Sequence, residues 1–151
     1  MSTGPSRPRF SDYPVLSFFN GAAQVPQFNG RDRKYRDYRT RITDSVNKIR
    51  KANFAGTNTL VEVWQTGGVV LFVIDTKSGR ILWSDALLPN TREIAFHVNS
   101  GLVLSQWNNS EQCYFEAYEW KNGRMHLIFE EDDGEVAEDV GCKNLFDKTY
   151  K

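Results

Sequence analysis

The strongest constraint on the fold is a succession of short segments with period-two hydrophobicity between residues 57 and 129. Turn-forming residues such as Gly67-Gly68 and Asn122-Gly123 separate these segments. Consecutive strands joined by short loops pair antiparallel, so the sequence predicts an antiparallel meander of about seven strands. The predicted strands are Thr57–Trp64, Val69–Asp75, Arg80–Ser84, Arg92–Val98, Leu102–Trp107, Gln112–Trp120 and Arg124–Phe129.

The segment Val69–Asp75 differs from the others because its apolar run is continuous. A strand without alternation is typical of a position that is covered on both faces. We therefore expect this strand at the centre of the sheet, with one face under a helix.

One amphipathic helix is predicted before the strands, at Asp32–Lys51. Its apolar residues recur every three or four positions and form a single stripe. Asn53 and Gly56 are expected to end the helix, because both tolerate positive φ. The predicted fold class is α+β, with this helix packed on the meander. The stripe comprises Tyr35, Tyr38, Ile42, Val46 and Ile49.

The 151 residues suit one domain. Residues 1–9 are predicted to be a disordered tail or a non-native remnant, and residues 10–151 a single α+β domain. An extended arm is expected to follow the tail, with its apolar residues held against the domain. These residues are Phe10, Tyr13, Val15, Leu16, Phe18 and Phe19.

The net charge is zero, which gives no overall field for a nucleic-acid or membrane partner, and neither partner is predicted. The charge is nevertheless uneven, because Arg31–Lys51 holds nine basic residues and Glu130–Asp139 holds seven acidic ones. Such asymmetry can mark a partner surface. Alternatively, the two segments neutralise each other or lie in water. Tyr35 and Tyr38 interleave with the bases but belong to the apolar stripe, which indicates a solvated basic face. No apolar run is long enough to span a membrane.

Residues for catalysis are scarce. The two histidines, His97 and His126, both lie in predicted strands, out of phase with the apolar positions. The chain has no zinc-binding spacing, phosphate loop or nucleophile motif, so we expect no metal site, no cofactor and no enzyme activity. A hydrolase that uses His97 or His126 with a carboxylate is the alternative.

The two cysteines, Cys113 and Cys142, allow one disulfide. Such a bond would indicate an oxidising compartment, whereas two buried thiols would suit the cytoplasm. The sequence leaves both possibilities open.

Several segments resemble a family of small, uncharacterised, exported bacterial proteins. The most specific is Asn53-Phe-Ala-Gly56, which follows a basic helix; Thr57-Asn58 and Gln65–Val69 stand where the family commonly has His-Tyr and a cysteine-containing turn. The resemblance implies export to the periplasm and no known activity, and the cytoplasm is the alternative location. The other matching segments are Phe10–Val15, Arg39–Ile42, Trp64, Ile74–Gly79 and Tyr118–Arg124.

The acidic run after the last predicted strand is the main candidate for a partner-binding surface. Clustered charge beside aromatic residues favours protein recognition. We expect a non-catalytic protein-binding domain, of the inhibitor or immunity type, that neutralises a bacterial toxin or enzyme with a basic surface. A periplasmic small-ligand or cell-envelope binding protein is a further alternative. The candidate contact residues are Glu130, Glu131, Asp132, Asp133, Glu135, Tyr118 and Trp120.

Overall fold

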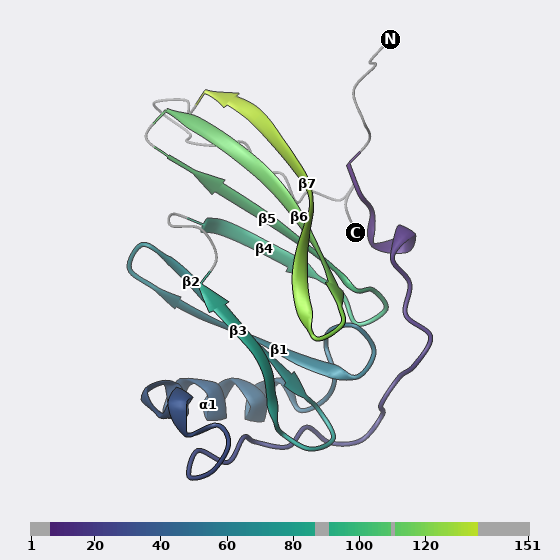
Figure 1. Cartoon of the computed structure of the whole chain (residues 1–151), viewed down its shortest axis with the longest axis vertical. Helices are drawn as coiled ribbons and strands as arrows, with labels where there is room; N and C mark the ends of the chain where they lie inside the picture. Colours follow the sequence, from purple (N-terminus) through teal and green to yellow (C-terminus); the bar gives the residue numbers. More distant parts are fainter. Residues whose placement is uncertain (1–6, 87–90, 110, 136–151) are drawn as a thin grey trace.

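A computed structural model describes residues 7–86, 91–109 and 111–135, and the fold class of this part is α+β (Figure 1). One α-helix, α1 (Arg39–Ile49), precedes all the strands. Two short 3₁₀ helices lie before it, η1 (Phe10–Asp12) and η2 (Arg33–Tyr38). The strands are β1 (Asn58–Gln65), β2 (Gly68–Asp75), β3 (Ile81–Ala86), β4 (Thr91–Phe96), β5 (Leu102–Asn108), β6 (Gln112–Lys121) and β7 (Arg124–Glu135).

The strands form two antiparallel sheets, with the orders β1-β2-β3 and β4-β5-β6-β7. The prediction of one continuous meander was therefore wrong, although the antiparallel pairing of sequential strands within each sheet is confirmed. The physical reason for the division is a shared core: Leu71 and Val73 of β2 lie in one buried cluster with Val103 of β5. Two sheets can bury such apolar faces against each other, which a single flat sheet cannot do.

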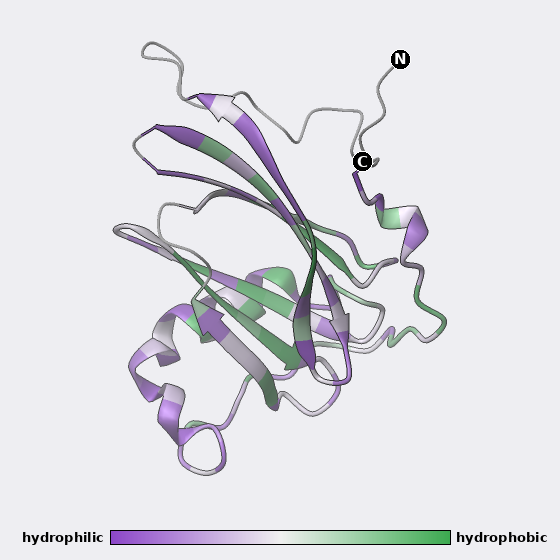
Figure 2. Cartoon of the chain, turned by 45° about the horizontal axis from the view of Figure 1, so that its top comes forward, coloured by the Kyte–Doolittle hydropathy of each residue, from purple (hydrophilic) through white to green (hydrophobic). Residues whose placement is uncertain are grey.

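Strand β2 is the centre of its sheet and is buried from Val69 to Ile74, as predicted. Its side chains alternate between two clusters. Leu71 and Val73 face the second sheet, whereas Phe72 and Ile74 share a cluster with Ile42 and Val46 of α1. Figure 2 shows apolar residues along the strands and many polar residues in the helical segment.

The predicted helix Asp32–Lys51 is divided into η2 and α1. Residues three apart eclipse in a 3₁₀ helix. Tyr35 and Tyr38 accordingly lie along one line, and their ring centroids are 5.6 and 5.2 Å from that of Phe72. The helix ends at Arg50 rather than at Asn53 or Gly56: Arg50 has φ of 70°, and its N–H donates to the Val46 carbonyl over 2.8 Å.

Strand β7 extends to Glu135, so the prediction that the acidic run follows the last strand was wrong. The pairing continues because β6 offers its edge as far as Gln112, which lies opposite Glu135. Irregularities at Cys113/Tyr114 and Ala117/Tyr118 shift the register. Successive acidic side chains in a strand point to opposite faces, which separates their like charges.

The N-terminal arm lies against the domain, as expected. Phe10 and Tyr13 pack against a buried cluster of the second sheet, and the Phe19 N–H donates to the Gly56 carbonyl over 2.9 Å. Leu16 and Phe18 are an exception, because they are 97% and 50% exposed. Some apolar residues of the arm therefore contact the domain, whereas Leu16 and Phe18 point into solvent.

Candidate functional site

The acidic residues of β7 divide between the two faces of its sheet. Glu130 lies opposite Glu116 of β6, and Asp132 lies opposite Tyr114. Residues opposite each other share a face, so these four residues lie on one face. Glu131 lies opposite Phe115, on the other face.

The buried Glu116 and the half-buried Tyr118 form the inner part of the first face. Glu116 is only 4% exposed, and its Oε1 accepts a hydrogen bond from the Tyr118 hydroxyl over 3.0 Å. Burial raises the pKa of Glu116, and the negative charge of Glu130 raises it further. The pKa of the Tyr118 hydroxyl is also raised, first by burial and then by Glu116 and Glu130. Both raised pKa values mean that burial and neighbouring carboxylates disfavour negative charge at Glu116 and Tyr118, so a nearby cation would stabilise this group.

Two stacked rings flank these carboxylates. The ring centroids of Trp107 and Tyr114 are 4.2 Å apart, and the rings are inclined by 18°. The buried Trp107 Nε1 has no partner at hydrogen-bonding distance, but its N–H lies near enough to Glu116 to lower the pKa of that carboxyl. Six residues make up what we name the acidic site: Trp107, Tyr114, Glu116, Tyr118, Glu130 and Asp132.

Within the described ranges, no cation forms an ion pair with a carboxylate of the acidic site. Glu130 and Asp132 are exposed, whereas Glu116 lies beneath the surface. An uncompensated group of carboxylates beside aromatic rings suits a cationic side chain, which gains from both the charges and the ring faces.

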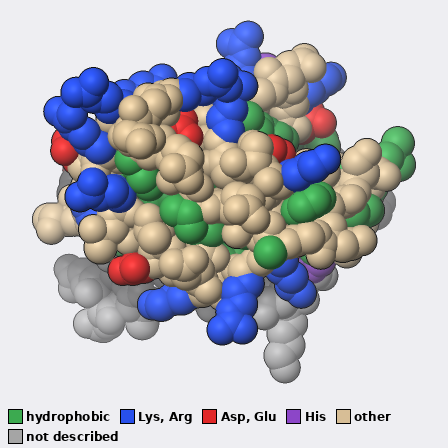
Figure 3. Space-filling view, turned by 90° about the horizontal axis from the view of Figure 1, so that it is seen from below, with side chains coloured by type: hydrophobic (Ala, Val, Ile, Leu, Met, Phe, Trp, Pro, Cys, Tyr) green, Lys and Arg blue, Asp and Glu red, His purple; other side chains and the backbone are tan. Residues whose placement is uncertain are grey.

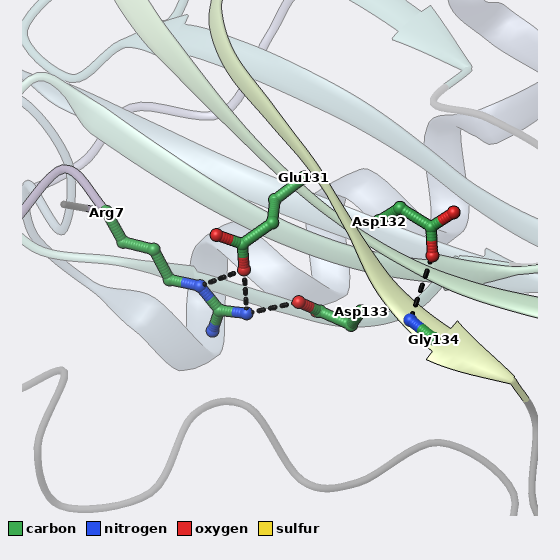
Figure 4. Close-up of polar contacts among 5 residues, drawn as sticks. All are labelled: Arg7, Glu131, Asp132, Asp133 and Gly134. Carbon is green, nitrogen blue, oxygen red and sulfur yellow. Dashed lines mark hydrogen bonds and ion pairs between the residues drawn. The ribbon is translucent and has the colours of Figure 1, made fainter. Parts of the chain in front are cut away.

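The other face of β7 holds Arg7 (Figure 4). The Arg7 guanidinium donates from Nε to Glu131 Oε1 over 2.8 Å, and its Nη2 contacts both Glu131 and Asp133. It also lies over the Phe115 ring, 4.2 Å from the centroid. Arg7 is part of the predicted disordered tail, and its contacts compensate Glu131 and Asp133. These two acids are therefore poor candidates for partner contact.

The carboxyl of Asp133 is expected to make the fold less stable as pH rises from about 4 to 6. Burial, followed by the hydrogen bond of Glu131, raises the pKa of Asp133 from 3.8 to about 6, although Arg7 opposes this rise. The folded state then binds more protons than the unfolded state between these values, so the contribution of Asp133 to stability is fully present below pH 3.8 and is lost as the carboxyl ionises up to about pH 6. The Asp133→Asn variant should lack this fall, which urea unfolding at pH 4 to 7 can measure.

The control is Asp37→Asn, the same substitution at an exposed carboxyl outside the contacts of Arg7. Parallel profiles for Asp133→Asn and the wild type would contradict the expectation. The neighbouring Glu131 has the opposite tendency: burial acts to raise its pKa, but the hydrogen bonds from Asp133 and Arg7 lower it overall. Its contribution to stability is lost only at more acidic pH.

The remaining predicted contact residues lie apart from the acidic site. Trp120 is half-buried between the sheets, with its ring edge-on to Phe54 at 6.3 Å and to Trp83 at 6.2 Å. Glu135 is exposed at the end of β7. The sequence did not indicate Trp107 or Tyr114, and it offered Glu116 only as one of several carboxylates in predicted strands. The signal that was available is their alternation in β5 and β6, in phase with Tyr118.

The two histidines lie in or next to different strands of the second sheet. His97 follows the end of β4 and is exposed, and its Nδ1 accepts the Asn99 N–H over 3.2 Å. His126 lies in β7, with Nε2 3.0 Å from the Lys121 carbonyl. In the described part of the chain, neither imidazole is hydrogen-bonded to a carboxylate.

Cys113 is disulfide-bonded, and Cys142 lies outside the described residues. The described residues hold no group of three or more His, Cys, Asp or Glu side chains placed to bind a metal ion. None of their helices has the length and apolar character needed to cross a membrane.

A groove of about 280 Å³ lies between α1 and β1. Lys48 and Glu62 supply its charges, and Trp64 and Phe96 supply aromatic surface. The Trp64 indole N–H donates to Glu62 Oε1 over 3.2 Å, and burial raises the pKa of Glu62. The groove is slightly smaller than typical small-molecule sites, which begin at about 300 Å³.

The Asn53-Phe-Ala-Gly56 motif connects several parts of the fold. Asn53 acts as a substitute strand partner: its Nδ2 donates to the Leu60 carbonyl over 3.1 Å, and its Oδ1 accepts the Leu60 N–H over 2.7 Å. Phe54 is fully buried between the sheets. The Gly56 N–H donates to the Val98 carbonyl over 2.7 Å. These contacts give the motif a structural role.

The basic segment forms an exposed surface around η2 and α1, which we name the basic face. Figure 3 shows Lys and Arg side chains distributed over this end of the molecule. Within residues 7–86, 91–109 and 111–135, none of them forms an ion pair with a carboxylate. Nine exposed side chains make up the basic face: Arg31, Arg33, Lys34, Arg36, Arg39, Arg41, Lys48, Arg50 and Lys51.

Comparison with family models, with curated proteins and with solved structures gives no match.

Proposed function

We propose that the protein is a non-catalytic binding domain that recognises a basic segment of another protein through the acidic site. The observation that carries the proposal is the group of Glu116, Glu130 and Asp132, which have no cationic partner among the described residues. A partner arginine or lysine would supply the missing charge. It would also face the Trp107 and Tyr114 rings, which adds a cation–π contribution.

The acidic residues of β7 lie on two faces of the sheet, and only one of these faces is proposed to contact the partner. Glu131 and Asp133 are compensated by Arg7, so the partner contacts fall on the face that carries Glu130 and Asp132. The buried Glu116 gains most from a cation, because a desolvated carboxylate depends most on a neighbouring charge. A rigid sheet with aromatic anchors and a charged rim suits an inhibitor or immunity-type protein. Export to the periplasm, as the family resemblance implies, would place the partner there.

Reversal of the exposed charges tests the proposal. The Glu130→Lys/Asp132→Lys variant is expected to weaken binding of an eight-residue peptide of alternating Arg and Gly about tenfold, equivalent to ~1.4 kcal/mol. The readout is the indole N–H resonance of Trp107, which lies inside the acidic site and responds to binding there. The same pair of proteins is then used to capture partners from cell extract, with mass spectrometry as the readout.

The matched control is Asp37→Lys/Asp44→Lys, which makes the same change of net charge at two exposed residues outside the acidic site. This control should bind the peptide as the wild type does and retain any captured protein. An unshifted Trp107 resonance would contradict the proposal, as would equal loss of affinity in both variants.

A further inference from the structure

The basic face is a second charged surface, and the function proposed for the acidic site does not use it. Its nine cations lie on one continuous stretch of chain, and all are exposed. Two of them lie near aromatic rings: Lys34 Nζ is 5.1 Å from the Tyr35 centroid, and the Arg41 guanidinium is 5.5 Å from that of Tyr38. The end of β7 with the acidic residues lies at the opposite end of the molecule (Figure 1). The basic face and the acidic site are therefore two separate surfaces of opposite charge.

Two hollows give the basic face a shape that suits anionic groups. The first has a volume of about 460 Å³ and lies between the start of η2 and the β2–β3 turn, with Arg31 and Arg80 in its lining. The second has a volume of about 490 Å³ and is lined by Arg33, Lys34, Arg36 and Asp37. Both are wide open, which suits the phosphates of an extended polymer better than a small enclosed ligand.

From this arrangement we infer that the basic face binds the phosphate backbone of double-stranded nucleic acid without sequence preference. The predominance of arginine favours phosphate, because the guanidinium offers paired donors to phosphate oxygens. Base stacking is disfavoured at Tyr35 and Tyr38, because both rings pack against Phe72 in the apolar cluster under the helix. Helix α1 is about 16 Å long, and a duplex carries roughly nine phosphate charges over that distance.

The test uses the full chain and a fluorescent 20-base-pair duplex, with anisotropy as the readout. Binding is expected at 50 mM salt, with equal affinity for two unrelated sequences. Six phosphate contacts would give a slope of log affinity against log salt of about −5. The Arg33→Glu/Arg36→Glu variant should lose at least tenfold in affinity and show a slope shallower by about 2.

The matched control is Lys121→Glu/Arg124→Glu, which makes the same charge change at two exposed residues beside the β6–β7 turn. Its affinity should stay within about threefold of the wild type, and circular dichroism should show that both variants are folded. Absence of duplex binding at 50 mM salt would overturn the inference, and so would equal losses in both variants. Tighter binding to vesicles with 30% phosphatidylserine, or to polyglutamate, would also overturn it. None of these results bears on the acidic site, which uses other residues.

Discussion

Replacement of Gly56 by alanine is expected to destabilise the protein more than any other single added methyl group that we consider. A Cβ atom at this position would lie 2.0 Å from the Ser17 carbonyl oxygen, and the φ of 78° is one that L-residues rarely adopt. The backbone of Gly56 also cannot move freely, because its N–H bonds to Val98 and its carbonyl accepts the Phe19 N–H. Backbone strain costs ~1–2 kcal/mol and overpacking a further ~1–3 kcal/mol.

Gly67 provides a matched comparison. Its φ is 88°, but nothing lies within 4 Å of an added Cβ. Gly67→Ala should therefore carry only the backbone strain, ~1–2 kcal/mol, and urea unfolding should show that Gly56→Ala costs a further ~1–3 kcal/mol. Equal losses of unfolding free energy in the two variants would show that the arm does not press against Gly56.

Phe72→Ala is expected to have the second large effect, a loss of roughly 3–5 kcal/mol in unfolding free energy. Phe72 is fully buried in the cluster that joins β2 to Ile42 and Val46 of α1. Its ring also contacts Tyr35 and Tyr38, so alanine would leave a cavity and two tyrosines without their aromatic neighbour.

The half-exposed Phe18 is the control for this substitution, and Phe18→Ala should change stability by no more than ~0.5 kcal/mol. Thermal and urea unfolding, followed by circular dichroism, measure both variants. If Phe72→Ala were as mild as Phe18→Ala, the tyrosines of η2 would not be part of the core. The argument against base stacking on the basic face would then fail.

The sequence predicted that the acidic run contributes to a binding surface, but it did not predict which residues join that run in the acidic site. Glu130 and Asp132 were found because they are part of a visible run of like charges. Trp107 was missed because an isolated aromatic residue in a strand carries no local signal, and nothing in the sequence singled out Glu116 among the carboxylates of the predicted strands. Their importance comes from the register of β6 with its neighbours, which places Glu116 opposite Glu130 and Tyr114 opposite Trp107.

The sequence by itself determined the local properties of this protein: the helical stripe, the period-two strands, the central position of β2 and the antiparallel pairing of sequential strands. Each depends on neighbours within a few residues, and the order of side chains along the chain records those neighbours directly. Only the tertiary structure decided that the strands form two sheets, that β7 continues into the acidic run as far as Glu135, and that Arg7 pairs with two acids of that run. These features depend on contacts between residues far apart in the sequence, where packing and charge compensation compete with local preference. Periodicity and composition carry no information about such contacts.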